Sequence, residues 1–335
     1  MKIPRHFIFP VWSLLWVGVT FVACASSSVQ PFIFSTTHQV GDTFMGIRLH
    51  GTLELPSIEV NGVKLTELSG LAWDADEKIL YAVSDQGYLF HLRPVITDHT
   101  LIDVVFLAAF PLTNNKGKRL WNKDAEGLTL LKSNNGKLGD SQLLISFERQ
   151  PTIARVTPQG KLMKRYTLPK LLQDIHHYAS SNEALEAVTI HPQFDILTAP
   201  EKPLKGNEGQ IVIYSLTGKQ WHFPVHSAPN SAVVAIEALA DGSVWVLERA
   251  FVSVFQPFFI SLRRVWLSSC ETCPNDSQPV TKFKQVVFWD NSKGWNLDNF
   301  EGLTHHQGAY FFMVSDDNDN SLQRTLLSYF ELLEN

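Results

Sequence analysis

Five acidic residues each end a short apolar run, and a basic residue directly follows three of them. These bases are Arg149, Lys202 and Arg249. Carboxylates that converge in a cleft supply the oxygen ligands that Ca²⁺ prefers, and arginine holds anionic groups through paired hydrogen bonds. The pattern therefore indicates chemistry on a small anionic or ester substrate. The acids are Asp85, Glu148, Glu201, Glu248 and Asp316, in the segments ILYAVSDQG, LLISFERQ, FDILTAPEK, VWVLERAF and YFFMVSDDN.

A second set of acids lies in a phrase that the chain repeats. A period near 50 residues is typical of repeat folds such as the propeller. In a propeller, equivalent residues converge on the central axis, so both sets of acids should meet there. The phrase reads LSGLAWD, AEGLTLL, LEAVTIH, AIEALAD and FEGLTHH. Its aligned residues, which are 57, 60, 51 and 64 positions apart, are Ser69, Glu126, Glu186, Glu237 and Glu301.

These residues suggest three roles at one site. A Ca²⁺ ion held there would polarise a carbonyl or phosphoryl oxygen and lower the pKa of a bound water. The candidate catalytic groups are Glu148, Glu248, Glu301 and His305, the last because it is close to Glu301. The candidate substrate-binding residues are Arg149, Lys202 and Arg249, and the candidate metal ligands are Asp85, Glu126, Glu201, Asp316 and Asp317. A structural alternative stays open, in which each repeated Glu caps backbone amides and an Arg neutralises it.

Short strands must position these residues. Each unit contains apolar runs rich in β-branched and aromatic residues and bounded by turns, which predicts strands. Four strands per unit predict an all-β fold, a single β-propeller. We count five four-stranded blades and keep six as the alternative; five is favoured because residues 38–66 could supply only two strands of a sixth. An N-terminal strand near 47–55 should complete the last blade and close the ring, and 170–184 is the one stretch expected to form a short helix.

The composition is that of a globular chain with a sizeable core. Of 335 residues, 44% are hydrophobic and 18% are charged, and the formal net charge is -5. Nucleic-acid-binding proteins favour a basic stripe, so this mild acidity argues against nucleic acid as a partner. We expect a monomer that acts on a small molecule.

The first residues have the order of a secretory signal. Lys2 and Arg5 precede an apolar run at 7–23, which is marginal in length for a retained membrane span. Ala23-Cys24-Ala25 fits ordinary signal cleavage, whereas the segment ending at Cys24 resembles a bacterial lipobox, in which a lipidated Cys24 attaches the chain to a membrane. We expect a signal peptide at 1–25, a linker at 26–37 and the propeller at 38–335. Either cleavage predicts export, to the bacterial cell envelope (periplasm or outer membrane) or into the medium.

The three cysteines also fit an exported chain. Exported proteins tend to pair their thiols, and Cys270 and Cys273 lie in a loop that a small disulfide would staple. A redox pair or half of a zinc site are the alternatives, although the sequence has no second cysteine pair to complete a zinc site. Pairing of these two residues leaves Cys24 for a lipid anchor.

The paired phrases resemble a known family. SGLAWD with LYAVSDQG, AEGLTLL with LLISFER, and FEGLT with FFMVSDDN resemble the phytase-like family, which is described as having esterase-like activity of phytase. The resemblance runs from about Leu65 to Leu333. It implies a propeller fold and hydrolysis of esters or phosphate esters, with calcium as the implied cofactor.

Hypotheses of different classes follow. The first is an exported hydrolase that uses a metal ion on an ester or phosphate ester at the mouth of the propeller channel. The second is a non-catalytic propeller lipoprotein of the cell envelope that binds a ligand or a protein. A lactonase-like calcium propeller is a further alternative. The sequence has no G-x-S-x-G nucleophile elbow, so we do not expect a serine esterase.

Overall fold

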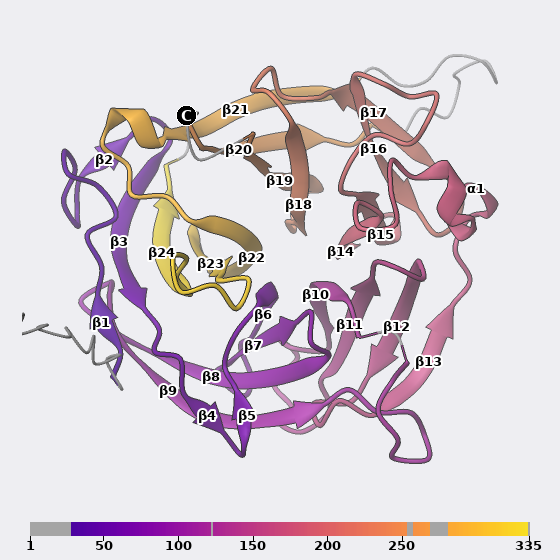
Figure 1. Cartoon of the computed structure of the whole chain (residues 1–335), viewed down its shortest axis with the longest axis horizontal. Coiled ribbons are helices and arrows are strands. Elements are labelled where there is room, and N and C mark those ends of the chain that lie inside the picture. Colours follow the sequence, from indigo (N-terminus) through magenta and orange to yellow (C-terminus); the bar gives the residue numbers. More distant parts are fainter. Residues whose placement is uncertain (1–27, 122, 253–256, 269–280, 334–335) are drawn as a thin grey trace, which may run out of the picture.

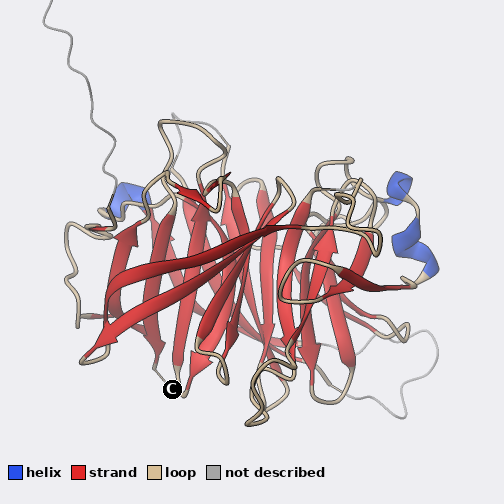
Figure 2. Ribbon diagram, turned by 90° about the horizontal axis from the view of Figure 1, so that it is seen from below, coloured by secondary structure: helices blue, strands red, loops and turns tan. Residues whose placement is uncertain are grey.

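Five antiparallel sheets surround a central axis and form a β-propeller (Figure 1). The computed structural model describes residues 28–121, 123–252, 257–268 and 281–333. Seen from the side, the strands run between two faces of a disc, and the connecting loops lie on those faces (Figure 2). The predictions of an all-β propeller and of five blades are therefore confirmed.

Four blades are meanders of consecutive strands, which follow one another from the axis outward. Blade 1 contains β6 (Leu68–Asp74), β7 (Ile79–Ser84), β8 (Tyr88–Thr97) and β9 (Thr100–Pro111). Blade 2 contains β10 (Ala125–Leu131), β11 (Gln142–Phe147), β12 (Thr152–Val156) and β13 (Leu162–Tyr166). Blade 3 contains β14 (Leu185–His191), β15 (Asp195–Pro200), β16 (Gln210–Ser215) and β17 (Gln220–Pro224). Blade 4 contains β18 (Ser231–Ala238), β19 (Ser243–Ala250), β20 (Phe259–Trp266) and β21 (Lys282–Asp290).

The fifth blade joins the two ends of the chain. Its outer strand pairs antiparallel with its neighbour, with Leu53 opposite Leu327. The predicted closure by an N-terminal strand is therefore confirmed. Blade 5 contains β22 (Asn299–Gln307), β23 (Tyr310–Asp316), β24 (Leu326–Leu332) and β3 (Ile47–Glu54). Two short strands pair with the outer strand, β1 (Gln30–Pro31) and β2 (Thr43–Phe44).

The remaining elements are short. Instead of one helix at 170–184, the chain forms two turns of helix, and the Asp174 side chain between them accepts a hydrogen bond from the backbone N–H of His176 at 2.9 Å. None of the helices in the described ranges is long and apolar enough to cross a membrane. The expected signal peptide with Cys24, and the Cys270 and Cys273 loop, lie outside the described residues. The short elements are α1 (Lys170–Gln173), η1 (Ile175–His177), η2 (Asn291–Lys293), β4 (Glu59–Val60) and β5 (Val63–Lys64).

The hydrophobic core consists of layers between neighbouring blades. Blades 4 and 5 share a layer that contains Trp289 and Phe300, and blades 5 and 1 share one that contains Phe90 and Phe312. Three further layers fill the other blade interfaces. Because each blade is covered on both faces by its neighbours, the alternation of apolar and polar residues expected of a half-exposed strand is weak.

The repeated phrase forms a β-bulge on each inner strand. The pairing register of β22 with β23 skips one residue between Phe300 and Gly302, which leaves Glu301 as the extra residue. A bulge re-aims the side chain of its extra residue. The same irregularity occurs on the inner strand of every blade, and the residues at the bulge are Ser69, Glu126, Glu186, Val234 and Glu301.

The register corrects one part of the sequence alignment. In blade 4 the irregularity falls between Val233 and Ala235, so the residue equivalent to Glu301 is Val234. Glu237 is three residues further along β18, at the opposite end of the channel. Alignment by residue type placed Glu237 with the other glutamates because AIEALAD imitates the Glu-small-apolar order of the phrase.

The Gly of the phrase is needed for the close approach of the inner strands. A Cβ atom on Gly127 would lie 2.7 Å from the backbone oxygen of Glu186 and 2.6 Å from Oγ of Ser146. That Oγ accepts a hydrogen bond from the N–H of Gly127 and donates one to the same Glu186 oxygen. The Gly therefore lets neighbouring blades touch through their backbones around the axis.

Replacing Gly127 with Ala is expected to lower the free energy of unfolding by about 1–3 kcal/mol, because the added methyl group must push two inner strands apart. Urea unfolding of the metal-free protein measures this change. Ala187 already holds the equivalent place in blade 3, so Ala187→Gly is the matched control and should cost about 1 kcal/mol or less. A Gly127→Ala protein as stable as the wild type would show that the inner strands can accommodate a methyl group at this position without moving apart.

Candidate functional site

Eight carboxylic acids gather at one end of the channel, which we call the acidic mouth. Antiparallel pairing places the start of each inner strand beside the end of the second strand of the same blade, so the acids of the two predicted sets converge here, except Glu237 and Glu248. Asp124, which directly precedes β10, joins them. The acids of the acidic mouth are Asp85, Asp124, Glu126, Glu148, Glu186, Glu201, Glu301 and Asp316.

Two groups of three carboxylates are close enough to share an ion. Asp124, Glu126 and Glu148 form the first set, and Glu148, Glu186 and Glu201 form the second. Within each set one oxygen from every residue lies within 4.8 Å of the others. Oxygens bound to one Ca²⁺ at 2.3–2.6 Å are at most about 5 Å apart, so each set has the spacing of a divalent-cation site. Glu148 belongs to both sets.

Burial and mutual repulsion raise the pKa values of these acids. Burial, followed by the charges of Glu67, Asp124 and Glu301, raises the pKa of Asp85 to about 7. Burial is also the main cause that raises the pKa of Glu148 to about 8 and that of Asp316 to about 9. The chain alone therefore cannot keep the acidic mouth fully ionised at neutral pH.

The metal-free protein should lose stability as the pH rises. A carboxyl group whose pKa is higher in the folded chain than in the unfolded chain binds more protons when folded, so unfolding becomes easier with increasing pH. The loss of stability begins near pH 4, where such groups titrate in the unfolded chain. It is complete above the pKa of about 9 of folded Asp316. We expect the melting temperature in a chelator to fall steadily from pH 5 to pH 9. A melting temperature that stays constant or rises over that range would contradict this.

Arg249 lies among the carboxylates and neutralises two of them. Its guanidinium donates hydrogen bonds to Glu301 at 2.7 Å, to Glu201 at 3.1 Å and to the side-chain oxygen of Asn299. Asn299 in turn donates to the same oxygen of Glu301 at 2.8 Å. One guanidinium cannot balance eight carboxyl groups, and a bound cation would supply the missing positive charge.

The other predicted bases have different positions. Arg149 is at the rim, where its side chain is 63% exposed and its Nε lies 2.7 Å from Oδ2 of Asp124. Lys202 donates three hydrogen bonds, two to Asn230 and one to the backbone oxygen of Ser231. Lys202 therefore fastens the connection between blades 3 and 4, and Arg149 is the base with a solvent-facing charge.

Three candidate residues either have partners outside the acidic mouth or lie away from it. Glu248 forms a buried two-pronged ion pair with Arg263 at 2.5 and 2.6 Å. Asp317 accepts hydrogen bonds from both the hydroxyl of Thr66 and the backbone N–H of Glu67, which ties blade 5 to blade 1. His305 is four residues beyond Glu301 on β22, about 13 Å along the strand. The predicted catalytic roles of Glu248 and His305, and the predicted metal-binding role of Asp317, find no support in these contacts.

Asp124 in the acidic mouth, and Asn299 and Glu67 beside it, were not predicted from the sequence. Each of them stands two positions before the bulged residue of its blade, as in Asp124-Ala125-Glu126. Extending the repeated phrase by two residues toward the N-terminus would have found them. Residues two apart on a strand point to the same side, and the side chain of Asn299 accordingly donates a hydrogen bond to that of Glu301.

Five blades and a carboxylate-lined axial mouth define the chain as a β-propeller with a candidate metal-binding site on its axis. The chain belongs to the phytase-like family, because the family model described as "Esterase-like activity of phytase" matches residues 63–319. The resemblance seen in the sequence is therefore confirmed. No curated protein sequence matches the chain.

Solved structures of low identity are also similar to the chain. The β-propeller domain of Cps50 (Swd1) from Myceliophteria thermophila is 11% identical with a TM-score of 0.42, and the match covers 92% of this chain and 96% of that one. The Dos1 propeller is 9% identical with a TM-score of 0.36, and the match covers 90% of this chain and 82% of that one.

Proposed function

We propose that this protein hydrolyses an ester or a phosphate ester at the acidic mouth with the help of a divalent cation. The observation that supports this most directly is the pair of carboxylate sets that share Glu148, each with its oxygens within 4.8 Å. Membership of the phytase-like family, whose description names an esterase-like activity, points to the same reaction class.

The donor atoms favour a hard cation such as Ca²⁺. All ligands in both sets are carboxylate oxygens, which suit calcium, magnesium and manganese rather than zinc or copper. Six to eight oxygen ligands are usual for calcium, and the two sets together contain five carboxylates, so oxygens of water or substrate would complete the coordination. When bound, the cation would polarise the scissile ester and lower the pKa of a water.

The residues around the two sets can move protons and orient the substrate. Oδ1 of Asp85 is buried and has no hydrogen-bond partner among the described residues. The pKa of Asp85 is raised to about 7, and a base with such a pKa works well near neutral pH. The sequence suggested Asp85 as a metal ligand, but it lies outside both carboxylate sets, and we assign it instead the removal of a proton from the attacking water. The exposed guanidinium of Arg149 at the rim can bind the anionic group of a substrate.

Export stays part of the proposal on the strength of the sequence alone. The charged, apolar and small-residue order of residues 1–25 supports a signal peptide, and the match of the segment before Cys24 to a lipobox supports a lipid anchor. Millimolar extracellular calcium would keep such a site filled, because sites of extracellular proteins bind calcium with dissociation constants of about 10⁻⁴–10⁻³ M.

The test combines metal analysis with a substrate panel. The purified full chain is dialysed against calcium, its metal content is measured, and it is assayed on an aryl phosphate, an aryl ester and a lactone with and without a chelator. We expect bound calcium and turnover of an ester or phosphate ester that the chelator abolishes. Metal binding without turnover would favour the non-catalytic propeller, and turnover of the lactone alone would favour a lactonase.

A further inference from the structure

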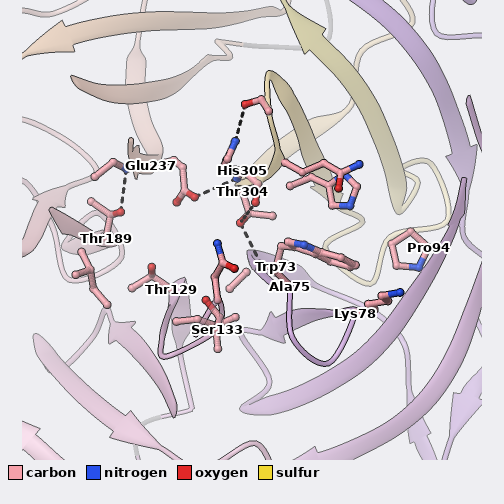
Figure 3. Close-up of a pocket in the computed structure, with 18 of the residues that line it drawn as sticks. Trp73, Ala75, Lys78, Pro94, Thr129, Ser133, Thr189, Glu237, Thr304 and His305 are labelled. Carbon is pink, nitrogen blue, oxygen red and sulfur yellow. Dashed lines mark hydrogen bonds between the residues drawn. The ribbon is translucent and has the colours of Figure 1, made fainter. Parts of the chain in front are cut away.

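The mouth opposite the acidic one opens into a cavity of about 820 Å³. Figure 3 shows the labelled side chains of Trp73, Thr129, Thr189, Thr304 and Glu237 around this space. The channel between the two mouths narrows to a space of about 10 Å³, which has room for about one water molecule. The cavity is therefore a separate compartment, and a volume of 300–1,000 Å³ is usual for small-molecule sites.

Threonine side chains on the floor of the cavity accept hydrogen bonds from the backbone of the next blade, and we call this contact a clip. Thr189 of blade 3 accepts a hydrogen bond from the backbone N–H of Ala238 in blade 4 at 3.0 Å. Thr304 of blade 5 accepts one from the N–H of Trp73 in blade 1 at 3.2 Å. These two threonines occupy equivalent positions, two residues after the small residue that follows each bulge. A single oxygen on the side chain is enough for this clip.

Blade 4 makes the same clip with Glu237. Its Oε1 accepts a hydrogen bond from the backbone N–H of His305 in blade 5 at 3.0 Å, so it stands in for the threonine hydroxyl. The second carboxyl oxygen is not needed for the clip, and the side chain keeps some exposure to the cavity that it lines. The fold therefore does not explain why this position is a glutamate.

The surroundings of Glu237 keep it neutral and leave it able to both donate and accept. Burial raises the pKa of Glu237 to about 8, so the protonated acid is the main form at pH 7. A protonated carboxyl group offers one O–H donor and an acceptor oxygen. The Thr189 and Thr304 hydroxyls are almost fully buried and serve the clips, so Thr129 supplies the further hydroxyl of the same mixed kind. The charged Lys78 and Arg93 side chains are exposed at the edge of the cavity.

Trp73 provides an apolar wall beside these polar groups. Its ring makes an edge contact with His306 at 4.6 Å and a tilted contact with Phe312 at 6.2 Å. These contacts fix the indole, which remains partly exposed where it lines the cavity. A rigid aromatic surface next to uncharged donors and acceptors suits a ligand with an apolar ring face and a polar edge.

We propose that this cavity binds a neutral cyclic polyhydroxyl compound, of the size of a monosaccharide or disaccharide, through Glu237, Thr129 and Trp73. The hydroxyl groups of such a ligand match donors and acceptors without a net charge, and the C–H face of its ring packs on the indole. This site is independent of the proposed hydrolysis, because it lies at the opposite mouth.

Isothermal titration calorimetry of the full chain in a chelator tests the proposal with glucose, galactose, maltose and sucrose as probes. We expect at least one of them to bind. Glu237→Thr keeps the clip oxygen used in blades 3 and 5 but removes the spare one, so it should weaken binding at least 10-fold with an unchanged melting temperature. Trp73→Ala should also weaken binding at least 10-fold, whereas Glu237→Gln, which imitates the neutral acid, should bind within about 3-fold of the wild type.

Three outcomes would overturn the proposal. Two of them are that none of the four sugars binds, or that Glu237→Thr binds as tightly as the wild type. The third is glucosamine binding more than 10-fold tighter than glucose, since that would show a cation paired with an ionised Glu237. Because Glu148 lies in the other compartment, Glu148→Gln should bind the sugar normally, which separates this proposal from the proposed hydrolysis.

Discussion

Replacing Glu148 with Gln is expected to weaken divalent-cation binding about 100-fold or more and to abolish the hydrolysis that depends on it. Glu148 is common to both carboxylate sets, so its charge contributes to either ion position. Loss of groups that merely orient metal ligands costs 10–100-fold in affinity, and loss of a shared ligand should cost at least as much.

The same replacement should leave the fold intact. Oε1 of Glu148 accepts a hydrogen bond from the backbone N–H of Ala184 at 2.9 Å, and the amide oxygen of Gln can accept it equally well. Removing one carboxylate also relieves the repulsion that raises the pKa values of its neighbours. The metal-free variant should therefore melt at or above the temperature of the wild type.

Calcium titration calorimetry, an aryl phosphate assay and thermal melting measure the three effects separately. Glu54→Gln is a matched control, because Glu54 is a partly exposed carboxylate that pairs with Arg324 on the outer side of blade 5. It should bind calcium and turn over substrate like the wild type. Calcium affinity in Glu148→Gln within 3-fold of the wild type would exclude the two carboxylate sets as the metal site.

The fold was predictable because its signals are local and repeated. Most of the apolar runs are strands, most turns within a blade are short, and the same order recurs five times. Register is harder to predict. A bulge shifts the pairing by one residue, and only the pairing of β18 with β19 shows that Val234, not Glu237, occupies the ring position. Residue type alone could not reveal this. Glu237 occupies the position at which blades 3 and 5 have Thr189 and Thr304, and it makes the same hydrogen bond to the next blade.

The partners of charged side chains were predictable only in part. The sequence suggested that Glu248 and Arg249 lie where β19 ends, so that both could reach the channel. In the structure β19 continues to Ala250, and both residues pair with β20. Neighbouring side chains of a strand point to opposite faces, so Arg249 reaches the acidic mouth while Glu248 turns toward Arg263. That arginine lies 15 residues later on the next strand, and nothing in the spacing marks it as the partner.

Replacing Glu248 with Gln is therefore expected to destabilise the protein strongly and to spare the acidic mouth. The Glu248 side chain is 0% exposed and that of Arg263 is 3% exposed. Arg263 also donates to the backbone oxygen of Pro224 at 2.7 Å, so it links blades 3 and 4. Removing one partner of a buried ion pair leaves the other charge uncompensated, which costs about 3–5 kcal/mol.

Urea unfolding gives the loss of stability, and calcium titration of the folded variant gives the effect on the site. We expect a loss of about 3–5 kcal/mol with calcium affinity within 3-fold of the wild type, the reverse of the result for Glu148→Gln. The double variant Glu248→Leu/Arg263→Met removes both charges and should recover more than half of the loss, because two apolar side chains of similar size can fill the same space. If Glu248→Gln instead kept its stability and lost calcium binding, Glu248 would have to be returned to the metal site.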